Sequence, residues 1–302
     1  MVHLMDIKQL KFLTALDEAR HFGRAASLCH ITQPTLSMRL RSLEQELGLS
    51  LVNRGQRFEG FTPEGERILA WARTLLAAHD GLQAEASACR GQLVGTLRLG
   101  VVPLCGFDPM RLISIFTAKY PHLRFQLFAL SSEQILERLS SNQLELGLSY
   151  LTTLDRTHFT SLELAETRMG LLYDDRYFTF ETTELGWEAL VRLPLGLLSS
   201  GMHFRQSIDH GFRSRALAVS PLLETDAVHI LLQSVLAGLF CAVIPLNSGL
   251  ESHHQHLRLV TIEDAQTLAP LGLILRRTAP RSTLGEACFA EAQALLGMSQ
   301  IP

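Results

Sequence analysis

The sequence has no long apolar run, no paired cysteines and no large excess of charge of one sign, and each absence excludes a class of protein. No stretch of about 18 uncharged apolar residues occurs, so we expect no transmembrane helix. Asp6, Lys8 and Lys11 interrupt the first apolar segment, which therefore lacks the core of a secretory signal peptide and predicts a cytoplasmic protein. The five cysteines are scattered without a C-x-x-C pair, which argues against a disulfide framework and a structural zinc site.

Motifs that carry catalysis are also missing. The sequence contains no G-x-S-x-G, no phosphate-binding G-x-x-x-x-G-K-[ST], no dinucleotide-binding G-x-G-x-x-G and no H-E-x-x-H. An enzyme is thus disfavoured, and neither a cofactor nor a metal is expected.

Arginine is concentrated in one early segment, although the net charge of the 302 residues is only −3. Between residues 20 and 57 there are six arginines and two acidic residues. A local basic patch on a mildly acidic protein is typical of a nucleic-acid-binding surface.

The first 50 residues predict three helices. Apolar residues at helical spacing cover residues 7–19, a short Ala-rich helix follows over residues 24–29, and the turn at His30 and Ile31 leads to a third helix that Thr32 caps and Gly48 ends. Leucines at 36, 40, 43 and 47 form its buried stripe, and Pro34, Met38, Arg41 and Gln45 point away from that stripe. This arrangement, with a polar and basic outer face on the last helix, predicts a helix-turn-helix.

A small hairpin and a long helix follow. Two short apolar pieces flank Arg54 and Arg57, and Thr62 with Pro63 begins a helix that runs to about residue 90. Its 4-3-4 repeat predicts a dimerisation seam, and the alternative is a helix packed on its own domain. The seam comprises Ile68, Ala72, Leu75, His79, Leu82, Ala86 and Cys89.

From residue 95 onward, apolar strands alternate with helices, which predicts mostly parallel sheets flanked by helices in an α/β domain. The expected strands include residues 96–102, 125–130, 144–151, 168–174, 195–199, 217–225, 241–246 and 271–277. Helices are expected over residues 109–120, 131–143, 203–212, 227–238 and 283–296.

The segment HFGRAASLCHITQPTLSMRLRSLEQELGLSLVNR, followed by FTPEGE, resembles the LysR-type transcriptional regulators over residues 7–66 without a gap. Weaker similarity continues through LRLGVVP, LSSNQLELGLSY and VLAGLFCAVIP. The resemblance implies an α/β protein with a winged helix-turn-helix (residues 1–62), a linker and dimerisation helix (63–91) and a two-lobed, periplasmic-binding-protein-like effector domain (92–302). Lobe I is expected over about residues 92–163 and 265–302, and lobe II over about 164–264.

The resemblance further implies a dimer or tetramer that binds an interrupted palindrome in double-stranded DNA, contacts RNA polymerase and is regulated by a small anionic effector bound between the lobes. Carried over by position, the DNA-binding residues are Gln33, Pro34, Thr35, Ser37, Met38, Arg39, Arg41, Arg54, Arg57 and Thr62. Gln suits adenine, Arg suits guanine or phosphate, and Met38 suits a thymine methyl group. Gly60 stands where relatives often have Arg, which thins the charge of the wing.

In the effector domain, the turn at Pro103–Cys105 and the cap at Ser131–Ser132 should place helix N-termini at the cleft, where backbone N–H groups favour anions. We expect Ser132 and Thr225 to face each other across it, although both residues could simply cap helices. The expected effector-binding residues are Pro103, Leu104, Cys105, Ser131, Ser132, Gly201, His203, Phe204 and Thr225.

Two further features leave alternatives open. Cys105 is either a reactive thiol near a helix N-terminus or a small buried apolar residue, and the second interpretation is favoured. A peroxide sensor of this family would use two cysteines near residues 199–210, where this chain has none. The SHHQH segment at residues 252–256 is interpreted as a polar loop rather than a metal site. A solute-binding protein with an added helical module is the remaining alternative, and it would not bind DNA with a steep salt dependence.

Overall fold

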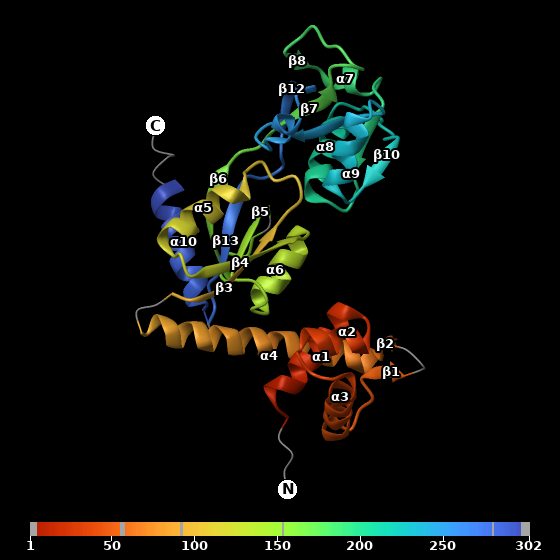
Figure 1. Ribbon diagram of the computed structural model, residues 1–302. Coiled ribbons are helices and arrows are strands. Elements are labelled where there is room, and N and C mark those ends of the chain that lie inside the picture. The colour runs from red at the N-terminus through yellow and green to blue at the C-terminus, as the bar shows by residue number, and fades with distance from the viewer. Residues whose placement is uncertain (1–4, 55–57, 91–92, 153, 280, 297–302) are drawn as a thin grey trace. The chain divides into compact units, whose positions relative to one another are not determined.

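The computed structural model describes residues 5–54, 58–90, 93–152, 154–279 and 281–296. The chain forms two units, one containing residues 1–89 and one containing residues 90–140 and 144–302. Figure 1 shows the helices and strands of each unit.

The N-terminal unit is a three-helix cluster followed by a two-stranded hairpin and a long helix (Figure 1). Leu13, Leu16, Leu36 and Leu43 are fully buried in its apolar core. Its elements are α1 (Ile7–Ala19), α2 (Phe22–Leu28), α3 (Gln33–Leu47), β1 (Val52–Arg54), β2 (Phe58–Phe61) and α4 (Pro63–Ala88).

Local side-chain caps set where these helices begin. Asp6 and Gln9 form a reciprocal capping box at α1, and Thr32 accepts a hydrogen bond from the backbone N–H of Thr35 at α3. The structure starts α2 at Phe22 rather than at residue 24, because the His21 Nδ1 accepts the N–H groups of Gly23 (3.1 Å) and Arg24 (3.3 Å). The second helix therefore begins two residues earlier than the sequence predicts.

The C-terminal unit consists of two lobes, each built on its own sheet (Figure 1). The first lobe has the strand order β4-β3-β5-β13-β6, and α5, α6 and α10 pack on it. Its elements are β3 (Gly95–Val101), α5 (Pro109–Lys119), β4 (Leu123–Ala129), α6 (Ser132–Ser140), β5 (Leu146–Tyr150), β6 (Phe159–Ala165), β13 (Leu271–Arg276) and α10 (Thr283–Leu296).

The second lobe has the strand order β10-β9-β11-β7-β12-β8, and α8 and α9 pack on it. The chain enters this lobe after β6 and returns to the first lobe after β12. Its elements are β7 (Arg168–Asp174), β8 (Glu184–Leu185), α7 (Trp187–Leu190), β9 (Leu195–Leu198), α8 (His203–Ser214), β10 (Leu223–Thr225), α9 (Val228–Leu236), β11 (Cys241–Pro245), the short 3-10 helix η1 (Leu250–His253) and β12 (Leu257–Gln266).

Both sheets are mixed, which corrects the expectation of mostly parallel sheets. In the first lobe β3 pairs parallel with β4 and β5, whereas β13 pairs antiparallel with β5 and β6. In the second lobe β9 pairs parallel with β10 and β11, whereas β7 pairs antiparallel with β11 and β12. The antiparallel strands arise where the chain passes from one lobe to the other and returns.

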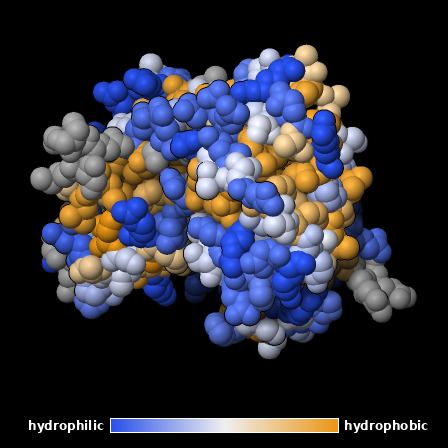
Figure 2. All heavy atoms as spheres, turned by 90° about the horizontal axis from the view of Figure 1, so that it is seen from above, coloured by the Kyte–Doolittle hydropathy of each residue, from blue (hydrophilic) through white to orange (hydrophobic). Residues whose placement is uncertain are grey.

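The surface is that of a polar protein with scattered apolar residues. Figure 2 shows hydrophilic residues over much of the visible face, with smaller apolar areas between them. Within the described part of the chain, no helix has the length and apolar character needed to cross a membrane.

Candidate DNA interface and effector pocket

The third helix, α3, has one buried and one exposed face. Leu36, Leu40 and Leu43 are at most 1% exposed and hold the helix against the core of the N-terminal unit. On the opposite face Gln33, Pro34, Met38, Arg39 and Arg41 are exposed, and Met38 exposes 60% of its surface. Thr35 and Ser37 are half-buried at the edge of this face.

The exposed side chains of α3 are only weakly engaged within the chain. Arg39 lies 4.0 Å from the exposed carboxylate of Asp6, a distance at which surface pairs contribute little. Arg41 forms no ion pair with any residue in the described ranges. Its guanidinium is thus available to a phosphate or a base edge.

The β1–β2 hairpin is tied to α3 by one carboxylate. Glu44 accepts the backbone N–H groups of Leu51 (2.9 Å) and Val52 (3.2 Å). Gly60 in the hairpin has a φ of +112°, a backbone conformation that Arg would strain. Of the two expected wing arginines, Arg57 lies outside the described residues, and only the backbone of Arg54, the last residue of β1, is described.

Thr62 uses both of its donors within the fold, which leaves none for the expected phosphate contact. Its hydroxyl donates to the Ser50 carbonyl (2.6 Å) and accepts the Gly65 N–H (2.9 Å), and its own N–H donates to the Leu51 carbonyl (2.9 Å). Thr62 therefore begins α4 and anchors it to the chain before β1.

The exposed apolar stripe of helix α4 overlaps only in part with the seam that the heptad pattern predicts. Ala72 is buried in the core of its own unit and Ile68 packs against that core. Trp71 (68%), Leu75 (43%) and Leu82 (69%) are exposed, and they lie on one side of the helix because they are 4 and 7 residues apart. The N-terminal half of α4 thus contributes to its own domain, and the exposed stripe includes Trp71.

A cavity of about 250 Å³ lies between the lobes of the C-terminal unit. Five expected effector-binding residues line it: Pro103, Ser131, Ser132, His203 and Phe204. The sequence did not single out the other lining residues, which are Val102, Ala129, Leu130, Gln134, Tyr150, Met202 and Asp226. Tyr150 and Asp226 stand at or just after the carboxyl ends of β5 and β10, where ligand residues gather in α/β folds, so that rule could have identified them.

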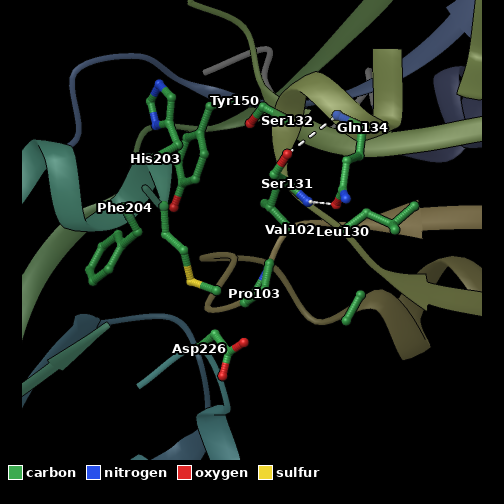
Figure 3. A pocket seen from close by; sticks show the side chains of 12 residues that line it. Val102, Pro103, Leu130, Ser131, Ser132, Gln134, Tyr150, His203, Phe204 and Asp226 are labelled. Atoms are coloured by element: carbon green, nitrogen blue, oxygen red, sulfur yellow. Dashed lines mark hydrogen bonds between the residues drawn. The ribbon is translucent and has the colours of Figure 1, made fainter. Parts of the chain in front are cut away.

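The first turn of α6 forms one side of this cavity. The Ser131 hydroxyl accepts the Gln134 N–H (3.3 Å), and the Gln134 side chain accepts the Ser131 N–H (3.0 Å), as Figure 3 shows. The hydroxyl of Ser132 accepts a bond from Ser149 (2.9 Å), which leaves its own proton available to a ligand.

An aromatic wall of the cavity comes from both lobes, with Tyr150 from the first lobe and His203 from the second. The rings of His203 and Tyr150 stack at 4.5 Å with 14° between their planes, and they lie side by side in Figure 3. One ring nitrogen of His203 contacts the Thr152 hydroxyl, and the other, Nδ1, is buried without a partner among the described residues. Burial lowers the pKa of His203 and the nearby Glu133 opposes this effect, so the neutral ring is favoured.

Four expected effector-binding residues lie away from this cavity. Leu104 and Cys105 line, with Pro103, a neighbouring groove of about 400 Å³. Gly201 and Thr225 line neither space, and the Thr225 hydroxyl accepts the Ala227 N–H (3.1 Å). Thr225 is thus not among the residues that line the cavity, and its hydroxyl closes the turn before α9.

Comparison with known proteins places the two units in one family. Residues 7–66 match the helix-turn-helix described as "Bacterial regulatory helix-turn-helix protein, lysR family", and residues 90–297 match "LysR substrate binding domain". The chain belongs to the LysR family. Its fold class and its resemblance to LysR-type regulators are thereby confirmed, and its function is DNA-binding transcription regulation rather than catalysis.

Individual relatives agree with this assignment. A hydrogen peroxide-inducible genes activator of Pectobacterium carotovorum is 37% identical over 228 residues, which cover 72% of this chain and 75% of the relative. The protein of the same name from Haemophilus influenzae is 28% identical over 272 residues, which cover 88% of this chain and 89% of the relative. The crystal structure of CbnR, a LysR family transcriptional regulator, shares the fold with a TM-score of 0.76 and 18% identity, covering 97% of this chain and 99% of CbnR.

Three cysteines of this LysR-family regulator, Cys105, Cys241 and Cys288, are not placed for thiol chemistry. Cys105 does not begin a helix, since Asp108 caps α5, and its thiol donates to the Phe107 carbonyl (3.1 Å). Burial raises the pKa of Cys105 to about 11, and burial likewise raises the pKa values of Cys241 and Cys288 to about 12. High pKa values keep these thiols protonated and poorly nucleophilic.

The histidine-rich segment forms part of a surface ion-pair cluster. The His256 Nδ1 lies 3.0 Å from a carboxylate oxygen of Asp175, and Arg258 lies 2.6 Å from the other. Within the described ranges, no group of three or more His, Cys, Asp or Glu side chains is arranged to hold a metal ion.

Proposed function

We propose that this LysR-family regulator recognises an interrupted palindrome as a dimer or tetramer and that a small effector, held between the lobes, alters that recognition. The exposed polar and basic face of α3 carries the proposal for DNA. A helix that buries leucines on one side and offers Gln33, Met38 and Arg41 on the other matches the donor, acceptor and methyl groups of the major groove.

In this proposal residues 1–62 form the DNA-binding domain, residues 63–91 the dimerisation helix and residues 92–302 the effector domain. The base-reading residues are drawn from Gln33, Pro34, Thr35, Ser37, Met38 and Arg39, with Arg41, Arg54 and Arg57 on phosphates or base edges. Since its target is chromosomal DNA and its output is transcription, the protein would act in the cytoplasm with RNA polymerase as a further partner.

Removal of one α3 arginine tests the DNA interface. Arg41→Ala should weaken binding and reduce the slope of log K against log salt by about one unit, as expected for one lost phosphate contact. Arg192→Ala removes the same charge from an exposed position in the second lobe and should leave that slope unchanged. Equal effects of the two variants, or no effect of Arg41→Ala, would contradict the assignment of α3.

The exposed stripe of α4 supports self-association. Trp71, Leu75 and Leu82 place three large apolar side chains in water, and a second copy of the helix packed along this stripe would bury them. Because Ile68 and Ala72 are already used inside their own unit, we assign the dimer contact to the exposed stripe rather than to the whole heptad seam.

The cavity between the lobes is suited to a small molecule. Its volume of about 250 Å³ is below the range of roughly 300–1,000 Å³ typical of drug-sized ligands. The first turns of α6 and α8 both border it, and their unpaired N–H groups favour a carboxylate or a comparable acceptor. The Ser132 hydroxyl adds a donor from the first lobe.

A response to peroxide, suggested by the names of two relatives, is less well supported. Residues 199–210 contain no cysteine, and the raised pKa values of Cys105, Cys241 and Cys288 disfavour the thiolate that reacts with an oxidant. A noncovalent effector is therefore the function that the cavity supports best.

A further inference from the structure

The cavity between the lobes has an acidic side chain that an anionic effector alone would not use. Of the 12 described residues that line it, Asp226 is the one with a carboxylate, and none is Lys or Arg. Asp226 is an exposed residue and its carboxylate makes no hydrogen bond or ion pair with any described residue, whereas Glu224, two residues earlier, is paired with the buried Arg205 at 3.0 Å. A carboxylate that faces a ligand cavity without a partner selects a cation or a strong hydrogen-bond donor.

The other groups around the cavity have the opposite polarity. The N–H groups of Ser132 and Glu133 in α6, and those of His203 and Phe204 in α8, lie in first turns where no intrahelical carbonyl can accept them. No side chain caps α8. These two helices belong to different lobes, so a carboxylate placed between them would interact with both.

The cavity is therefore bipolar over a short span. Figure 3 shows Asp226 on the side of the cavity away from Ser132, beyond Pro103. A simple carboxylic acid would satisfy the helix N-termini but would bring a second negative charge into a cavity that already has the Asp226 carboxylate. A simple amine would pair with Asp226 and leave the N–H groups without an acceptor. A molecule that carries both groups satisfies both ends.

We propose that the effector is a small zwitterion, with a carboxylate at the α6 and α8 N-termini and an ammonium group at Asp226. This inference rests on the proposed function of the cavity as the effector site, and it narrows the anionic effector expected from the family to an amino acid or a molecule of the same chemical class. Asp226 is the specificity residue, because it distinguishes an amino acid from the corresponding acid that lacks nitrogen.

Matched ligands and matched variants test this inference on the full-length protein. The probes are the 20 standard L-amino acids, screened by thermal shift and followed by calorimetry, each with its deaminated acid and its decarboxylated amine. We expect at least one amino acid to bind, and both of its derivatives to bind at least about tenfold more weakly, since loss of one charge-assisted hydrogen bond has that effect. Asp226→Asn should weaken binding of the amino acid by a similar factor. Binding of the deaminated acid should be unchanged or tighter in this variant.

The control variant is Asp264→Asn, which makes the same chemical change at an exposed residue of the second lobe outside the cavity. Asp264 has a φ of +48°, which Asn also tolerates. The Asp264→Asn variant should therefore bind the amino acid as tightly as the wild type does. Three results would overturn the proposal of a zwitterionic effector. They are a deaminated acid that binds the wild type as tightly as the amino acid does, an Asp226→Asn variant that weakens both ligands equally, and a screen in which no amino acid binds. DNA affinity measured with and without a bound probe reports separately on the proposed function, because a probe that binds without changing it contradicts effector control and leaves the chemistry of Asp226 intact.

Discussion

Replacement of Gly65 by alanine is expected to destabilise the N-terminal unit strongly, although both residues are acceptable in a helix. Gly65 lies in the first turn of α4, directly against the backbone of Leu51. A Cβ atom at this position would stand 2.0 Å from the Leu51 carbonyl oxygen, where ordinary contacts begin at 3.4 Å. Since that oxygen accepts the Thr62 N–H (2.9 Å), the chain cannot move aside without breaking the junction between the hairpin and α4.

The size of the effect follows from the contacts that must shift. Overpacking a tight site costs about 1–3 kcal/mol, and loss of the Thr62 backbone bond and of the Thr62 cap adds about 1 kcal/mol each. The better helix propensity of alanine returns about 1 kcal/mol. A net loss of about 3 kcal/mol corresponds to a fall of roughly 10–20 °C in the melting temperature of a unit of this size.

Gly81→Ala in the same helix is the matched control. A Cβ atom at Gly81 meets nothing within 4 Å, so this substitution should stabilise α4 by about 0.5–1 kcal/mol and raise the melting temperature by a few degrees. Scanning calorimetry of the full-length protein, with DNA affinity measured in parallel, separates the two variants. If Gly65→Ala melted at or above the wild-type temperature, the close approach of α4 to Leu51 would be wrong.

Three further predictions follow from exposure and burial. Leu75→Glu combined with Leu82→Glu should give monomers by light scattering at low micromolar concentration, and persistent dimers would remove α4 from the interface. Burial lowers the pKa of His203 in the folded protein, so the folded state binds the His203 proton less readily than the unfolded state does. The free energy of unfolding should therefore be highest above a pH of about 6.5 and decrease below that pH, by at most about 1.4 kcal/mol per pH unit. Urea unfolding of the wild type and of His203→Gln at pH 7.5 and 5.5 measures this decrease. An equal decrease in the variant would show that another group titrates. Iodoacetamide at pH 7.5 should modify the exposed Cys89 well before Cys105, whose pKa is about 11, and mass spectrometry showing equal rates would refute the burial argument.

The DNA-binding part could be predicted closely because its signals are local. Thr32, the leucine stripe and Gly48 specify where α3 begins, which face it buries and where it ends, and each acts over a few residues of chain. The expected exposure of Met38 and Arg41 follows from the same period. What local pattern could not provide was the use of the Thr62 hydroxyl, because its acceptor, the Ser50 carbonyl, lies 12 residues away.

The cavity between the lobes could be predicted only in part. Ser131, Ser132 and His203 were expected because helix starts can be recognised in sequence, whereas Tyr150 and Asp226 depend on which strand ends the topology brings together. Strands β6 and β12 were missed since neither has a continuous apolar pattern, and β12 includes Glu263 and Asp264. Both sheets are mixed because β7 and β13, the first strands after the chain crosses between the lobes, run antiparallel to the neighbouring strands β11 and β5.

The sequence by itself determined the family, the helix boundaries of the DNA-binding unit and the α/β character of the effector unit, because these depend on periodicity, caps and a long composite motif. Tertiary structure decided what each position does within that frame. Ile68 and Leu75 belong to one heptad pattern, yet one packs on its own core and the other is exposed. Gly65 and Gly81 are both helical glycines, yet only at Gly65 does a neighbouring backbone occupy the place of a Cβ atom. The physical reason is that such differences arise from segments distant in sequence, which meet only when the chain has folded.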